Sequence, residues 1–176
     1  MASIIKANQL QDFGGNSILT SDGAGTVTIN SAQMKNTPAF HCTMSGSQTI
    51  ANATTTILQY DTEVYDTDSA FNTSNYTFTA PSAGKYFFKI ATMGIFCDSA
   101  SEICIIGVYV NGTQYQKTTH NRGTVGTDTS FFHESIVPLS ASDAVTAKIY
   151  HTQGSSRGTD AAVASTFFQG YKLIGA

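Results

Sequence analysis

The spacing of aromatic residues between Asp66 and Phe88 strongly restricts how this chain can fold. The pattern D-x4-F-x6-F-x5-G-x-Y-x-F is formed by Asp66, Phe71, Phe78, Gly84, Tyr86 and Phe88. Within it, Tyr86, Phe88 and Ile90 recur at every second position, which is the period of a β-strand with one apolar face. Pro81 and Gly84 precede this run, as expected for a turn. The segment therefore predicts core strands of a β-sandwich.

Composition agrees with an all-β protein. Of the 176 residues, 41% are hydrophobic and only 12% are charged, and no long stretch has the 3.6-residue period of a helix. This length suits one domain with one core. The net charge of -3 argues against a nucleic-acid-binding surface. No run of 18 apolar residues occurs, so the sequence predicts no membrane-spanning segment.

The texture of the chain changes near Pro38. Residues 1–37 are polar and rich in Gly and Thr, with short strand-like runs at 17–20 and 26–29. Such a segment has too little apolar surface to form a core of its own. We therefore expect an N-terminal β arm over residues 1–37 and a head domain over residues 38–176.

Strands are predicted in the head wherever apolar and polar residues alternate. These strands are Ile57–Val64, Tyr76–Thr79, Lys85–Met93, Ile103–Val110, Thr113–Lys117, Phe131–Val137, Val145–His151 and 165–173. Asn111 and Gly112 separate two of them, and this dipeptide favours the tight turn of a β-hairpin.

The aromatic spacing resembles the C1q globular domain, which belongs to the C1q/TNF superfamily of trimeric jelly rolls. Tyr60 and Ile90 stand where that family has Phe and an aromatic residue. Two further segments are similar to the family. The run Leu139-x3-Asp143-x-Val145 resembles a Leu…Gly-Asp-x-Val turn, with Ser142 in place of Gly, and residues 165–173 resemble the last strand.

The resemblance implies a homotrimeric, C1q/TNF-like jelly-roll sandwich. Nine residues are expected to pack in its core or between copies: Phe40, Tyr60, Phe71, Phe78, Gly84, Tyr86, Phe88, Phe167 and Tyr171. The chain carries 8 Tyr and 11 Phe. This is more aromatic surface than one small sandwich hides comfortably, which agrees with additional burial on assembly.

No residue pattern predicts catalysis, so we expect no catalytic, metal or cofactor site. Residues 154–158 match G-x-S-x-G, but the triad order also requires an Asp and a His downstream, and no histidine follows His151. His41, His120, His133 and His151 lack metal-ligand spacing. His133 and His151 are expected in strands, where they could face each other across the sheet.

Four acidic residues and three cysteines leave alternatives open. Asp61, Glu63, Asp66 and Asp68 could share a face and bind calcium, as in some C1q-like trimers, although solvated edge charges account for them more simply. Cys42, Cys97 and Cys104 are expected to be reduced thiols, with a Cys97–Cys104 bridge as the alternative. Met1 to Leu10 lacks the pattern of a secretory signal peptide, which favours synthesis in the cytoplasm.

Residues 1–37 resemble the N-terminal stretches of bacteriophage tail and virion structural proteins. The expected function is therefore that of a virion protein, a trimeric tail fibre, knob or capsid decoration. The arm would attach to phage capsid or tail proteins, and the C1q-like head would point outward. Three copies of its outer loops would then bind a host-surface glycan with avidity. The alternative is a cellular C1q-like recognition protein or lectin.

Overall fold

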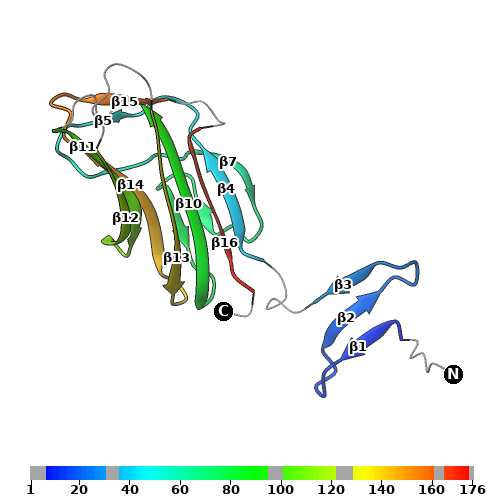
Figure 1. Ribbon diagram of the computed structural model, residues 1–176. Helices are drawn as coiled ribbons and strands as arrows, with labels where there is room; N and C mark the ends of the chain where they lie inside the picture. The colour runs from blue at the N-terminus through cyan, green and yellow to red at the C-terminus, as the bar shows by residue number, and fades with distance from the viewer. Residues whose placement is uncertain (1–6, 31–35, 95–100, 122–128, 161–164, 175–176) are drawn as a thin grey trace.

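The computed structural model describes residues 7–30, 36–94, 101–121, 129–160 and 165–174. All regular elements in these ranges are β-strands, which confirms the predicted all-β class, and none is a helix that could span a membrane. The first three strands pair only with one another and form what we call the arm sheet (Figure 1). These antiparallel strands are β1 (Gln9–Gln11), β2 (Ser17–Ser21) and β3 (Val27–Ile29).

The remaining strands form two antiparallel sheets that pack face to face. The first, the β10 sheet, is built around the long strand β10, with β13 on one side and β16 on the other. Beyond β16 follow β4 and the edge strand β7, while β15 pairs with the end of β10 and carries β5. Its strands are β4 (Ala39–Thr43), β5 (Thr49–Ile50), β7 (Thr62–Asp66), β10 (Gly84–Gly94), β13 (Thr129–Leu139), β15 (Arg157–Asp160) and β16 (Phe167–Lys172).

The second sheet, the β11 sheet, has the order β12-β11-β14-β9-β8, and β6 also pairs with β14. Its strands are β6 (Thr56–Ile57), β8 (Phe71–Asn72), β9 (Thr77–Thr79), β11 (Ile103–Val110), β12 (Thr113–Asn121) and β14 (Ala144–His151). The interior between the two sheets is the hydrophobic core of the head.

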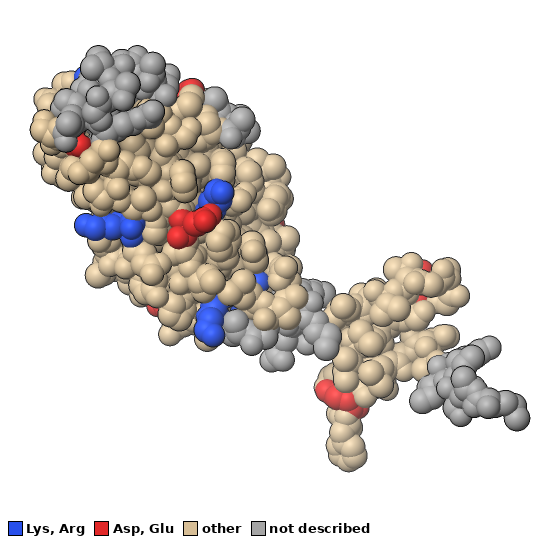
Figure 2. All heavy atoms as spheres, in the orientation of Figure 1, with Lys and Arg blue, Asp and Glu red and all other residues tan. Residues whose placement is uncertain are grey.

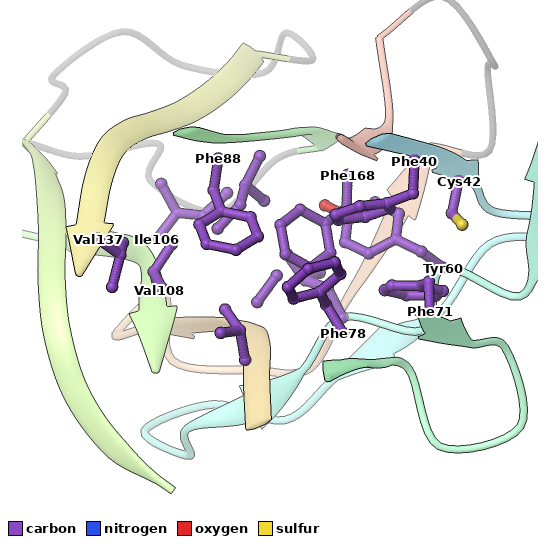
Figure 3. Close-up of a cluster of buried hydrophobic side chains, with 14 of the residues drawn as sticks. Phe40, Cys42, Tyr60, Phe71, Phe78, Phe88, Ile106, Val108, Val137 and Phe168 are labelled. Carbon is purple, nitrogen blue, oxygen red and sulfur yellow. The ribbon is translucent and has the colours of Figure 1, made fainter. Parts of the chain in front are cut away.

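Stacked aromatic rings fill the core (Figure 3). The ring of Phe40 lies 5.0 Å from Phe71, 5.1 Å from Phe78 and 5.0 Å from Phe168, centroid to centroid. Each of these side chains is at most 5% exposed. Burying a side chain of this size contributes about 1.5–3 kcal/mol, and each ring pair adds roughly 0.5–1.5 kcal/mol. The cluster therefore joins the two sheets.

The structure explains the spacing of the aromatic pattern. The carboxylate of Asp66 accepts a hydrogen bond from the backbone N–H of Phe71 at 2.7 Å, which fixes the loop between β7 and β8 and directs Phe71 inward. Gly84 starts β10 with φ of 155°, a conformation that side chains rarely adopt. Gly170 is equally restricted, because a Cβ there would lie 2.7 Å from a ring carbon of Phe88.

Tyr60, which stands where C1q-like domains have Phe, has a partner for its hydroxyl group. The side chain is fully buried, and its hydroxyl donates a hydrogen bond to the carbonyl of Ala91 at 2.9 Å. Burial raises the pKa of the Tyr60 hydroxyl well above its usual value. The extra oxygen is therefore accommodated as a hydrogen-bonded link to β10.

The predicted single strand over Ile57–Val64 is wrong. Its first residue belongs to β6, which pairs with β14 in the β11 sheet, whereas Thr62 begins β7 in the β10 sheet. Between them the chain crosses from one sheet to the other, and Leu58 and Tyr60 are buried on the way. The alternating apolar residues of this segment therefore belong partly to a crossover between the two sheets and partly to a strand.

The predicted hairpin at Asn111 and Gly112 is confirmed. Both residues have positive φ, 50° and 82°, as the tight turn between β11 and β12 requires. The Asn111 side chain donates to the carboxylate of Asp143 at 2.8 Å and accepts from the backbone N–H of Ala144 at 2.9 Å. Hydrogen bonds from Asn111 and Ser140 lower the pKa of Asp143. The Asp143 of the family-like turn therefore ties two turns together.

His133 and His151 do not face each other, contrary to expectation. His133 lies in β13 with its Nδ1 3.0 Å from the Thr118 hydroxyl, whereas the Nε2 of His151 lies 3.2 Å from the carbonyl of Ile50. Both side chains are at most 4% exposed. Burial lowers the pKa of each imidazole below 6.5, because the charged form loses its hydration.

Replacement of Ser142 by glycine is expected to stabilise the head. Ser142 has φ of 71°, which costs a side-chain-bearing residue about 1–2 kcal/mol, partly offset by the extra flexibility of an unfolded glycine. Ser142→Gly should raise the melting temperature by about 1–3 °C in differential scanning calorimetry. Ser140→Gly, at a neighbouring position without positive φ, is the matched control and should be neutral or destabilising. Equal effects of both changes would contradict the strain.

The buried histidines should make the head sensitive to mild acid. Because their folded pKa values are below the unfolded value of 6.5, the unfolded chain binds more protons as pH falls. The stability is complete above about pH 6.5 and is lost as pH falls through the folded pKa. Urea unfolding between pH 7.5 and 5.0 should show this loss. His133→Gln should make the free energy of unfolding depend less steeply on pH. An unchanged slope would mean that His133 does not contribute.

Candidate assembly surface

The outward face of the β10 sheet carries aromatic residues that the core cannot accommodate. Cross-strand pairing places side chains of four strands in transverse rows on this face. One row runs Ala39, Tyr171, Phe87 and Ile136 across β4, β16, β10 and β13. Another runs Phe167, Ala91 and Phe132 across β16, β10 and β13. Two apolar rows therefore cross the sheet on its outer side.

A polar row lies between the two apolar rows. It runs Tyr65, His41, Gln169, Lys89 and Glu134 across the same face. The Nζ of Lys89 lies 3.7 Å from the carboxylate of Glu134, so the two charges pair within one chain. The imidazole of His41 lies 5.6 Å from the ring of Phe167 and 6.0 Å from that of Tyr65. The row therefore contains one pair of opposite charges and two aromatic rings among its five residues. We call the three rows together the assembly surface.

Several large apolar side chains of the assembly surface are open to solvent. Ile136 is 53% exposed, Phe132 51%, Tyr65 48% and Tyr171 38%. The molecular surface in Figure 2 likewise shows few charged side chains among uncharged ones. Large exposed apolar side chains gathered on one face, here in two rows on either side of a polar row, favour an interaction site.

The nine expected packing residues fall into two groups. Phe40, Tyr60, Phe71, Phe78, Tyr86 and Phe88 lie in the core between the sheets, and Gly84 opens β10. Phe167 and Tyr171 instead point outward from β16 and belong to the assembly surface, since they pair with Ala91 and Phe87. The ring of Tyr171 lies 5.4 Å from that of Phe87.

Sequence analysis overlooked the outer residues of β10 and β13. The sequence predicts Phe87 only as part of the strand over Lys85–Met93, and Phe132 and Ile136 only as part of the strand over Phe131–Val137. The sequence feature that indicates an outer apolar face is the presence of aromatic residues on both faces of β10, with Phe87 on one face and Tyr86 and Phe88 on the other. Apolar residues on both faces of a strand favour burial of both faces.

The G-x-S-x-G run lies in a turn. Gly154 has φ of 88°, and Arg157 and Gly158 begin β15, which pairs with β5 and β10. No helix follows the serine in the part of the chain that the structure describes, so the nucleophile-elbow geometry is not formed there. Residues 157–160 form a strand that extends the β10 sheet and that was not among the predicted strands.

Two of the four acidic residues, Asp61 and Asp66, hold loops through their carboxylates. Burial opposes the charge of Asp61, but hydrogen bonds from the Ser45 hydroxyl at 2.6 Å and backbone at 2.7 Å outweigh it and lower the pKa of the carboxyl. Asp66 accepts from Phe71 and, at 3.3 Å, from Asp68. Glu63 lies on β7. Among the described residues, no three potential ligands gather as a metal site would require. Calcium binding therefore gains no support here.

Two of the three cysteines lie among the described residues, and both are buried. Cys42 is a free, buried thiol beside the aromatic core, and burial raises its pKa to about 12. Cys104 is buried in β11, as its apolar neighbours predict. Cys97 lies outside the described residues, so its pairing with Cys104 stays an open alternative.

Comparison with known proteins identifies the architecture. No family model and no curated protein matches the sequence. Among solved structures, murine APRIL aligns with a TM-score of 0.57 at 13% identity, covering 77% of this chain and 98% of that chain. The globular domain of zebrafish complement 1qA protein aligns at 0.53 and 13%, covering 77% and 97%. Eiger TNF from S. frugiperda aligns at 0.54 and 14%, covering 78% and 93%.

These similarities concern the fold, since the identities are low. They agree with the all-β architecture described above. The chain therefore has a C1q/TNF-like jelly-roll fold.

Proposed function

We propose that this protein is a homotrimeric structural protein of a bacteriophage particle, a fibre, knob or decoration protein located in the virion. The observation that carries the homotrimer is the assembly surface, and the virion role rests on the resemblance of residues 1–37 to the N-terminal stretches of phage structural proteins. A folded monomer would leave Phe132, Ile136, Tyr65 and Tyr171 in water. Covering them with copies of the same chain removes this surface from water at roughly 25 cal/mol per Å2.

Three-fold assembly follows from the resemblance to the trimeric C1q/TNF jelly rolls. The face has no unpaired charge cluster that would oppose close approach, because Lys89 and Glu134 pair with each other. Three heads joined in this way would display three copies of each outer loop. Weak binding to a repetitive host-surface glycan would then gain avidity.

The arm is the proposed anchor to phage capsid or tail proteins. Its three strands form a small sheet that makes no backbone pairing with the sandwich strands among the described residues. The arm strands pair with one another within one chain, so the short strand-like runs of the arm do not need a partner's sheet in order to be hydrogen-bonded. The outer edges, β1 and β3, still offer unpaired backbone groups to a partner strand.

A cellular C1q-like recognition protein is the second candidate. Similarity to the zebrafish complement globular domain supports it as much as the virion role, since both proposals use the same fold. Copurification with virus particles discriminates between them: a virion protein is found in washed particles, and a recognition protein is found outside them.

Introducing a charge on the assembly surface should dissociate the trimer. Phe132→Glu removes about 1.5–3 kcal/mol of apolar burial from each contact and places carboxylates in it. Analytical ultracentrifugation at micromolar concentration should show a trimer for the native protein and a monomer for the variant. Tyr115→Glu, on the exposed strand β12 of the other sheet, is the matched control and should remain trimeric. A monomeric native protein would refute the trimer.

Removing residues 1–37 should abolish attachment to particles. Purified protein starting at Pro38 would be mixed with particles that lack it, and bound protein would be quantified beside the full chain. Cooperative melting of the shortened protein is the control for folding, and it also tests the proposed domain boundary. Incorporation at the full-length level would place the anchor in the head.

A further inference from the structure

The arm sheet has one apolar face. Leu10 pairs with Leu19, and Leu19 pairs with Ile29, so these three side chains form a row on one side of the sheet. Val27, two residues before Ile29, points to the same side. Leu10 is 54% exposed and Val27 57%. A hollow of about 160 Å³ is lined by Ala7, Leu10, Leu19 and Val27 together with four polar residues, and most of its exposed lining is apolar.

The opposite face of the arm sheet carries a chain of polar contacts. Gln9 donates to the hydroxyl of Ser17 at 2.6 Å, Ser17 lies 3.0 Å from the hydroxyl of Thr20, and Asn30 donates to Thr20 at 3.0 Å. Each of these polar side chains therefore has a hydrogen-bond partner within the arm sheet while it faces solvent. The arm sheet is therefore amphipathic, with one face suited to solvent and one suited to burial.

Charges on the arm are confined to its turns. In residues 7–30 the charged side chains are Asp12 and Asp22, which follow β1 and β2. Asp12 accepts from the backbone of Asn16 at 2.8 Å, and Asp22 accepts from the backbone of Ala24 at 2.7 Å. Hydrogen bonds from these neighbours lower the pKa of both carboxyls. The apolar face itself is uncharged, so several copies can approach through it without like-charge repulsion.

The arm joins the head at the assembly surface. Pro38 accepts a hydrogen bond from the backbone of Lys172 at 3.0 Å, and the next residue, Ala39, pairs with Tyr171 in an apolar row of that surface. The segment 31–37 that connects them reaches at most about 25 Å, at roughly 3.5 Å per residue. Heads that associate through this surface thus bring their arms together at an effective concentration on the order of millimolar.

We propose that the apolar faces of the three arm sheets pack against one another and form a closed stalk below the head. The occupant of the face is the arm of a second copy, and the inference rests on the proposed trimer. A three-stranded sheet with one bare apolar face is marginal alone, and self-association covers that face while leaving the polar face outside. The free edges of β1 and β3 remain for the particle.

The test is site-directed disulfide crosslinking in the full chain. Leu10→Cys, on the apolar face, should give disulfide-linked dimers on a non-reducing gel after mild oxidation, with a yield independent of dilution. Thr28→Cys, on the opposite exposed face, is the matched control and should crosslink at least tenfold less. Native protein controls for Cys42, Cys97 and Cys104. Sedimentation of the same samples gives the oligomeric state.

Each outcome decides the inference. Crosslinking through position 10 in a trimeric sample, with little through position 28, supports the closed stalk. A trimeric sample without crosslinking through position 10 overturns the stalk and leaves the trimeric head intact. Equal crosslinking through both positions also overturns it, because the arms would then meet without a preferred face. A monomeric sample overturns the proposed function and the stalk together.

Discussion

The ring of Phe40 is the contact on which the rest of the head depends. It extends from β4 in one sheet and stacks on Phe71 and Phe78 from the other. Phe168 meets it edge-on at 89°. This packing needs the glycine at 170, since a Cβ there would lie 3.0 Å from the Phe40 ring. The position of the Phe40 ring therefore depends on the glycine at 170 and on the strands β4 and β16 that carry the two residues. The aromatic layer sets the distance between the two sheets.

Most of the fold could be predicted because the spacing of its motif residues is set by interactions between residues close in sequence. The pattern from Asp66 to Phe88 combines a side-chain cap, a glycine with unusual φ and a period-2 strand, all of which are visible in one sequence. The Asn111–Gly112 turn is equally local. The crossover between Leu58 and Tyr60 and the strand at residues 157–160 were not predictable in this way. Both depend on which distant strand supplies the hydrogen bonds, and neither the alternating apolar residues of the crossover nor the polar residues 157–160 carry that information.

The assembly surface was harder to predict than the core. Phe167 and Tyr171 were expected to pack, but nothing in their own strand says whether they face the interior or the outside. Pairing with Ala91 and Phe87 decides the question, and that register is a property of the folded sheet. Apolar residues on both faces of β10 were the available sign of a second covered face. The arm posed the same difficulty, since its amphipathic character appears only when Leu10, Leu19 and Ile29 are aligned across strands.

The pairing of Lys89 with Glu134 inside one chain has a consequence for fidelity. Charges can select a partner when they form ion pairs only with the partner chain, because a wrong partner then leaves them unpaired. Here the two charges are already satisfied in the isolated head. In the proposed trimer, the aromatic rows around them would contribute shape and apolar surface alone. Such a trimer would discriminate weakly against close variants of its own chain, and co-expressed variants are expected to form mixed trimers.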